Sequence, residues 1–246
     1  MRPLELSEVS QYIRDNIGAG FHDKKIAKLK KLTLDDIIKR KNPYLFKAKN
    51  TNSANDFVTA VLDATVSSGE ETIFGNFLER VAIFVCKSVY GGDKSSTLSL
   101  DLDFYIDKAR YLVSIKSGPN WGNSGQIDAM IKKFNTAKKT LATSGGMAGA
   151  HIVCVEACCY GKDGVVDKGT HLKLCGQRFW ELISGGDKSL YKDIIEPLGH
   201  KAKEKNDELD LLYTAKANVF TQAFVERFCV KGIIDWDKLI QFNSGK

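Results

Sequence analysis

The chain of 246 residues lacks any apolar run approaching the roughly 18 residues of a membrane-spanning helix. Its first residues, Met1 to Glu5, lack the basic-then-apolar order of a secretory signal peptide. No internal repeat is evident. We therefore expect a cytoplasmic protein without a membrane partner.

Paired metal-binding spacings are missing too. None of the six cysteines forms a Cys-x-x-Cys pair matched by a second pair or by histidines, as a structural zinc site requires. The cysteines are therefore predicted to be reduced core thiols. The four histidines are scattered, with no serine or cysteine in a recognisable nucleophile setting, which argues against a catalytic triad.

What is present is an ordinary globular composition, 43% hydrophobic and 27% charged, with a net charge of +6. The length suits one large domain or two small ones. Positive charge that is compatible with a polyanionic partner gathers in two segments. Their candidate phosphate-binding residues are Lys24, Lys25 and Lys28 in the first and Lys132 and Lys133 in the second. The alternative is that both segments are ordinary solvated faces.

The central segment of the chain is the most informative. Residues 100–104 and 111–116 alternate apolar and polar side chains, which indicates two half-buried strands. The polar residues 107–110 between them are few enough for a hairpin. A helix is expected before this hairpin, and a helix at 126–140 and a strand at 151–160 after it. This order predicts an α/β fold with a mixed central sheet flanked by helices.

Alternation along the two strands brings chemical groups together. Asp101 and Asp103 share a face of the first strand, and Ser114 and Lys116 share a face of the second. Carboxylate oxygens suit hard cations such as Mg²⁺, and a nearby lysine can orient a water or stabilise a phosphate. These groups suit metal-assisted phosphodiester hydrolysis, although a surface hairpin with an ordinary ion pair is the alternative.

Two helices are expected ahead of the hairpin, separated by a break at Ser67-Ser68-Gly69. The second carries apolar residues on nearly all sides, and Glu79 lies among them. A buried carboxylate needs a partner. Glu79 therefore either forms a salt bridge or faces solvent, or it faces a metal site beside the hairpin.

An Asp on one strand, followed after a turn by x-x-Lys on the next, resembles the core of the PD-(D/E)XK nucleases. The run Ser114-Ile115-Lys116-Ser117-Gly118, with Trp121 close behind, resembles the type II restriction endonucleases that cut RGGNCCY-type sites. Weaker similarities follow in the same order, from about Asn42 to the C-terminus. They lie at Thr72-Ile73-Phe74-Gly75, at Phe179-Trp180 before Ser184-Gly185-Gly186, and at Trp236-Asp237-Lys238-Leu239.

This resemblance implies a restriction-endonuclease-like core with additional N- and C-terminal helices. Residues 1–66 would form a helical region for DNA contact or dimerisation, and residues 67–246 the nuclease core with a C-terminal helical extension. The implied activity is site-specific cleavage of double-stranded DNA with Mg²⁺, or Mn²⁺ in its place, leaving 5′-phosphate and 3′-hydroxyl ends. A homodimer in the bacterial cytoplasm is implied, with a cognate DNA methyltransferase as a functional but not a physical partner.

The resemblance also implies residue roles. Asp101 and the Ile115 carbonyl would bind metal, and Lys116 would hold the attacking water. The superfamily pattern has Asp or Glu where this chain has Ser114. Either Glu79 or Asp103 would supply the missing carboxylate, and we favour Glu79.

Polar residues directly after the second strand are candidates for contact with DNA bases or backbone. They are Asn120, Trp121, Asn123, Ser124 and Gln126. The alternative for Trp121 is core packing. Two other functions remain open, a nuclease for repair or mobile elements without a fixed site, and a catalytically idle DNA-binding protein on the same fold. The serine at 114 is the best argument for the idle protein.

Overall fold

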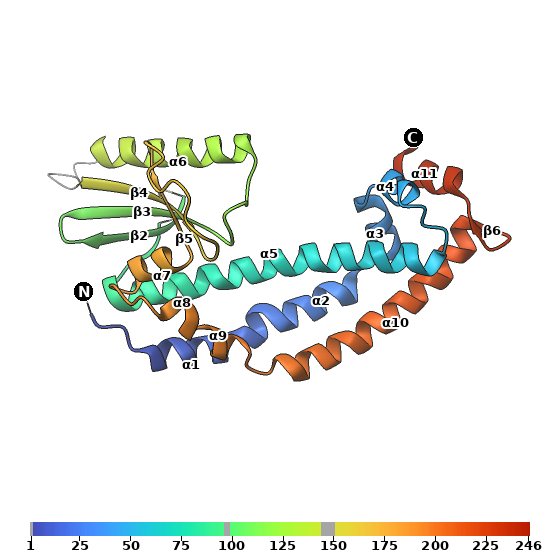
Figure 1. Cartoon of the computed structure of the whole chain (residues 1–246), viewed down its shortest axis with the longest axis horizontal. Helices are drawn as coiled ribbons and strands as arrows, with labels where there is room; N and C mark the ends of the chain where they lie inside the picture. Colours follow the sequence, from blue (N-terminus) through green and yellow to red (C-terminus); the bar gives the residue numbers. More distant parts are fainter. Residues whose placement is uncertain (1, 96–98, 144–150) are drawn as a thin grey trace. The chain divides into compact units, whose positions relative to one another are not determined.

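The computed structural model describes residues 2–95, 99–143 and 151–246 (Figure 1). The chain divides into two compact units. Unit 1 contains Met1–Ile17 and Phe74–His200, and unit 2 contains Gly18–Ile73 and Lys201–Lys246. One helix, α5 (Ala54–Tyr90), contributes to both units, and the expected division between residues 66 and 67 lies inside this helix.

Unit 1 is built on a five-stranded sheet of order β1-β2-β3-β4-β5. Its strands are β1 (Asp93–Ser95), β2 (Leu100–Ile106), β3 (Ala109–Lys116), β4 (His151–Cys158) and β5 (Leu172–Cys175). The first three strands pair antiparallel, and β3, β4 and β5 pair parallel. The prediction of an α/β fold with a mixed sheet is therefore confirmed.

The predicted hairpin is the β2–β3 pair. Leu102 lies opposite Val113 and Phe104 opposite Tyr111, so the two alternating patterns are in register. The turn passes through Asp107, whose φ of 51° is in the left-handed region that aspartate tolerates better than most residues.

Helices cover both faces of the sheet (Figure 1). On one face, Met130 and Phe134 of α6 (Ser124–Thr143) pack with Leu112 and Cys154 of the strands. On the other, the part of α5 in unit 1 reaches β2, where the rings of Tyr90 and Phe104 stack. The other helices of unit 1 are α1 (Leu6–Ile17), α7 (Gln177–Ile183), α8 (Leu190–Asp193) and α9 (Ile195–Leu198).

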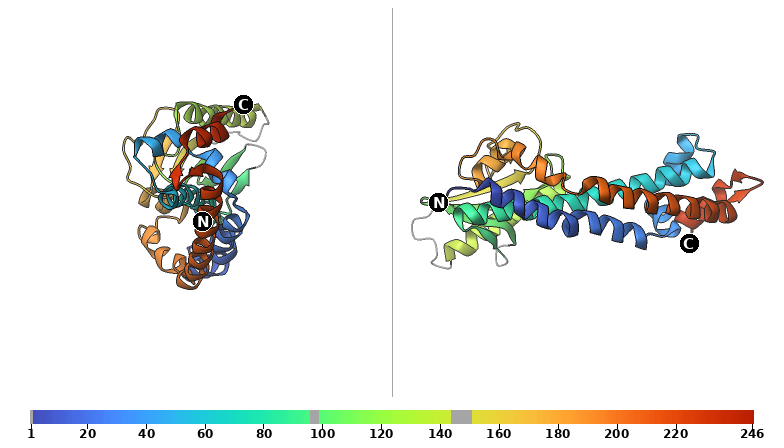
Figure 2. Two further views of the ribbon diagram at one scale, coloured as in Figure 1. Left: turned by 90° about the vertical axis from the view of Figure 1, so that its right-hand side faces the viewer. Right: turned by 90° about the horizontal axis from the view of Figure 1, so that it is seen from below.

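Unit 2 is mainly helical, and a short β-hairpin follows the long helix α10 (Ala202–Phe228) near the C-terminus (Figure 2). Besides α10 and part of α5, its elements are the π-helix η1 (Gly18–His22), α2 (Asp23–Lys31), α3 (Leu34–Arg40), α4 (Pro43–Ala48), β6 (Cys229–Val230), β7 (Ile233–Ile234) and α11 (Trp236–Ser244). Its core includes Phe57, Phe224 and Phe228, whose rings lie in contact.

The expected break at Ser67-Ser68-Gly69 is wrong, because α5 runs through it as one helix of 37 residues. Glycine costs roughly 1 kcal/mol in a helix interior, which packing easily overrides. Here Gly69 is buried against the Lys28 side chain, where a Cβ would approach the lysine Nζ to 2.7 Å. The residue that suggests a break therefore allows a close contact between α2 and α5.

Candidate active site

Asp101 lies at the start of β2, beside the last residues of β3. Its Oδ2 accepts hydrogen bonds from the Ile115 backbone N–H, at 2.8 Å, and from the Ser114 hydroxyl, at 3.3 Å. Because these two donors hold one oxygen, the orientation of the carboxylate is set and Oδ1 is left to face another partner.

That partner is the ammonium of Lys94 on β1. Its Nζ lies 2.9 Å from Glu79 Oε1 and 4.0 Å from Asp101 Oδ1. The hydrogen bond to Glu79 raises the pKa of Lys94 above its ordinary value. Glu79 of α5 and Asp101 of β2 thus face one cation. Both carboxylate side chains are about one-fifth exposed (23% and 22%), and the lysine side chain is 57% exposed.

The carboxylate oxygens of Glu79 and Asp101 are the type of ligand that a divalent cation prefers, and they already share one positive charge. It is not a complete metal-binding cage. Within residues 2–95, 99–143 and 151–246, no three His, Cys, Asp or Glu side chains gather closely enough to hold a metal ion. Further ligands would come from backbone oxygen, water or substrate, as is usual for Mg²⁺.

Asp103, two residues further along β2, is engaged differently. Arg110 donates to both carboxylate oxygens, from Nε to Oδ1 at 2.8 Å and from a terminal nitrogen to Oδ2 at 2.6 Å. This bidentate pair is mostly buried. Of the two carboxylates considered for the charge absent at Ser114, Glu79 faces Asp101 across Lys94, whereas Asp103 faces Arg110.

Lys116 ends β3, on the same strand face as Ser114. Its Nζ lies 4.6 Å from the centroid of the Trp121 ring, a cation–π geometry. The Trp121 indole N–H donates to Glu156 Oε1 on β4, at 2.8 Å. Trp121 also packs at the edge of the apolar cluster under α6, so part of its ring is buried.

Glu156 is the most deeply buried carboxylate of this region. Lys173 Nζ lies 2.7 Å from its Oε1, and His171 Nε2 lies 3.1 Å from its Oε2. Burial alone would raise the pKa of Glu156, but the hydrogen bonds from His171, Lys173 and Trp121 outweigh it and lower the pKa to about 2.

The polar loop after β3 leads into the N-terminus of α6. Asn123 and Gln126 cap this helix reciprocally, because each backbone N–H donates to the other residue's side-chain oxygen at 3.0 Å. Asn120 and Ser124 are exposed beside them. Apart from Trp121, these expected DNA-contacting side chains are thus all exposed, with two amide oxygens used as caps.

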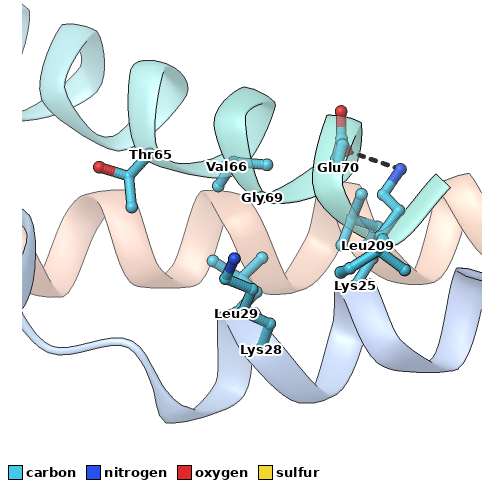
Figure 3. Close-up of a pocket in the computed structure, with 9 residues that line it drawn as sticks. Lys25, Lys28, Leu29, Thr65, Val66, Gly69, Glu70 and Leu209 are labelled. Carbon is cyan, nitrogen blue, oxygen red and sulfur yellow. Dashed lines mark ion pairs between the residues drawn. The ribbon is translucent and has the colours of Figure 1, made fainter. Parts of the chain in front are cut away.

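The expected lysines belong to both units. Lys132 and Lys133 are exposed on α6 of unit 1, and Lys24 and Lys28 are exposed on α2 of unit 2. Lys25 is different, because its side chain is 10% exposed and its Nζ lies 2.7 Å from Glu70 (Figure 3).

Lys25 and Glu70 also line a pocket between α2, α5 and α10 (Figure 3). Its free volume of about 20 Å³ has room for a single water molecule. This pocket is therefore too small for a nucleotide or another organic ligand.

Sequence reasoning missed Lys94 and Glu156. Lys94 lies in a short polar segment that has no periodic pattern to place it. Glu156 carried a signal, because it is the single charged residue within the apolar strand that follows His151. A lone carboxylate in such a strand predicts buried partners.

The mixed sheet with helices on both faces, and the acidic and basic groups at the end of its central hairpin, define a restriction-endonuclease-like α/β fold. A family model described as type II restriction endonuclease EcoO109I matches residues 7–206. The chain therefore belongs to this family. Membership supports a DNA-binding endonuclease of a restriction system.

The search of curated proteins found no match. Among the residues described, no helix is both long and apolar enough to cross a membrane.

Proposed function

We propose that this protein is a type II site-specific deoxyribonuclease that hydrolyses double-stranded DNA with Mg²⁺. One observation carries the proposal. Glu79 and Asp101 face a shared cation beside a strand that ends in Lys116, in a chain of the restriction endonuclease family.

Glu79, Asp101 through Oδ1, and the Ile115 carbonyl would hold the Mg²⁺, and Mn²⁺ would substitute for it. The ion would neutralise charge on the phosphate and lower the pKa of a bound water. Lys94 must first withdraw its ammonium. Its side chain is 57% exposed, so the withdrawn ammonium would be solvated at little cost.

The chain's own groups divide the remaining work. Ser114 and the Ile115 N–H orient the Asp101 carboxylate. The Lys116 ammonium donates to the attacking water and to the phosphate oxygens, where negative charge builds up in the transition state. Water attacks phosphorus and the bond to the 3′ oxygen breaks, which leaves 5′-phosphate and 3′-hydroxyl ends. Glu79 supplies the negative charge that Ser114 lacks.

DNA recognition by a homodimer completes the proposal, because a two-fold protein matches a palindromic site. The exposed amides of the loop after β3 and the exposed lysines of α2 and α6 are the proposed DNA contacts. Cleavage by such an enzyme requires a cognate methyltransferase in the same bacterium to protect its own sites.

The test is cleavage of plasmid DNA by the purified protein in Mg²⁺, with Asp101→Asn and Lys116→Ala as disabling variants. We expect discrete bands from the wild type. Each variant should lose at least about 100-fold in single-turnover rate, as expected when a transition-state charge contact is removed. Asp103→Asn is the matched control, two residues along the same strand, and should cleave at a near wild-type rate once circular dichroism shows it folded.

Each outcome assigns a function. A smear in place of bands would identify a nuclease without a fixed site. A gel shift without cleavage would identify an idle DNA-binding protein, for which Ser114 is the structural argument. Near wild-type rates in both Asp101→Asn and Asp103→Asn would remove the hairpin end from the active site.

A further inference from the structure

We infer that Glu156 and Trp121 form a positioning pair that restrains the Lys116 ammonium at the end of β3. This inference rests on the proposed function for its catalytic meaning, since Lys116 is the proposed catalytic lysine. The restraint itself is a separate physical claim, and it can be measured without any cleavage assay.

The geometry forms a short chain of contacts. Glu156 accepts the Trp121 indole N–H at 2.8 Å, and the Lys116 Nζ lies 4.6 Å from the centre of the same ring. An indole has a donor at its edge and negative potential on its faces. Fixing the edge with a carboxylate therefore fixes the direction of the face that attracts the ammonium.

Glu156 is suited to act as the fixed end. Its side chain is 4% exposed, and its oxygens also contact Lys173 at 2.7 Å and His171 at 3.1 Å. A buried carboxylate with several partners has one orientation, because any rotation would leave a charged group unsatisfied. Trp121 is then held from both sides, by Glu156 and by the apolar cluster under α6.

A second pair in the chain provides a natural comparison. In unit 2, Lys47 Nζ lies 5.2 Å from the centroid of the Trp236 ring. Within the described residues, the Trp236 indole N–H has no hydrogen-bond acceptor. Lys47 and Trp236 thus make the same kind of cation–π contact without a carboxylate that orients the ring.

The first experiment measures lysine restraint by acetylation. The full chain is treated with trace acetic anhydride, and the acetylation rate of each lysine is measured by peptide mass spectrometry. Trp121→Leu should speed acetylation of Lys116 about two- to fivefold and leave Lys47 unchanged. Trp236→Leu should speed acetylation of Lys47 and leave Lys116 unchanged. Trp121→Phe keeps a ring but loses the N–H, so Lys116 should react at an intermediate rate.

The second experiment separates positioning from DNA contact. DNA affinity is measured in Ca²⁺, and single-turnover cleavage is measured in Mg²⁺. Trp121→Leu should lose about tenfold or more in cleavage rate, because small misplacement of a catalytic group is costly, while the Kd for DNA stays within about twofold. Glu156→Gln keeps an acceptor oxygen for the indole and should cleave faster than Trp121→Leu. Trp236→Leu should cleave normally.

Three results would overturn the inference. Unchanged Lys116 acetylation in Trp121→Leu would show that the ring does not restrain the lysine, and a weakened Kd in that variant would make Trp121 a DNA contact. Faster acetylation with full cleavage, in a protein that Lys116→Ala inactivates, would show that the restraint is not used in catalysis. If the wild type cuts no DNA, the proposed function fails and the catalytic part of the inference fails with it. The acetylation result alone then shows whether the Trp121 ring restrains Lys116.

Discussion

Among the described residues of unit 1, two clusters in which lysine lies beside buried or partly buried carboxylate differ in how fully their charges are satisfied. We call Glu79, Lys94 and Asp101 the open cluster, and Glu156 with Trp121, His171 and Lys173 the buried cluster. In the open cluster the lysine is 57% exposed and lies 4.0 Å from one carboxylate. In the buried cluster a single carboxylate that is 4% exposed has three partners within 3.1 Å.

This difference separates two uses of the same residue types. A buried carboxylate that keeps all its partners is a fixed structural element. If it lost any one of them, the desolvation of its charge would no longer be compensated. A partly exposed pair gains little from its ion pair, so its cation can be exchanged for another. The buried cluster therefore suits a scaffold role, and the open cluster suits exchange of Lys94 for a divalent cation.

The largest expected effect comes from breaking the buried cluster. Glu156→Ala removes the acceptor that Trp121, His171 and Lys173 share, and should lower the free energy of unfolding by about 3 kcal/mol or more. Urea denaturation measures this loss. Glu79→Ala is the control from the open cluster and should cost less than about 1 kcal/mol. Equal losses in the two variants would contradict the proposed difference.

Acid should remove the contribution of Glu156 to the free energy of unfolding without a mutation. The pKa of Glu156 is lowered to about 2 in the folded protein, below the ordinary value of 4.5. A depressed carboxyl pKa favours the folded state above the unfolded value, so this contribution is complete above about pH 4.5 and declines as the pH falls toward 2. It amounts to roughly 3 kcal/mol.

The measurement is urea unfolding at a series of pH values, for the wild type and for Glu156→Gln. The variant should lose less stability than the wild type between about pH 5 and the lowest pH at which the fold persists. Parallel curves would mean that Glu156 does not contribute to acid sensitivity.

The smallest expected change in stability belongs to the open cluster. Lys94→Met removes the ammonium between Glu79 and Asp101, and should alter the unfolding free energy by less than about 1 kcal/mol. Affinity for Mg²⁺, measured by calorimetry, should rise severalfold, because the ion no longer competes with an internal cation.

Lys87→Met is the matched control for that prediction. Lys87 pairs with Asp93 at 2.6 Å and its side chain is 62% exposed, so this variant removes the same charge from a nearby surface ion pair. Its Mg²⁺ affinity should match the wild type. If both variants bind Mg²⁺ more tightly to the same extent, the gain reflects net charge and Lys94 does not compete for the site.

The sequence determined those features that depend on local spacing. Alternation along β2 and β3 predicted the hairpin and the shared face of Ser114 and Lys116, because the two-residue period of a strand is a property of its backbone. The mixed sheet followed from the order of elements. The same reasoning brought Asp101 and Asp103 together with Lys116 at the strand end, whereas in the structure Asp101 accepts from the Ser114 hydroxyl at 3.3 Å and Asp103 pairs with Arg110.

Tertiary structure alone decided the rest. α5 continues through Gly69 because packing against Lys28 outweighs the small intrinsic cost of glycine, which no local pattern reports. Glu79 and Asp101 face the same ammonium because β1, a strand the sequence did not indicate, places Lys94 between them. The partners of Glu156 lie 15 to 35 residues from it in the chain. Such contacts depend on how the elements pack, so the sequence could indicate the hairpin but not the charges that surround it.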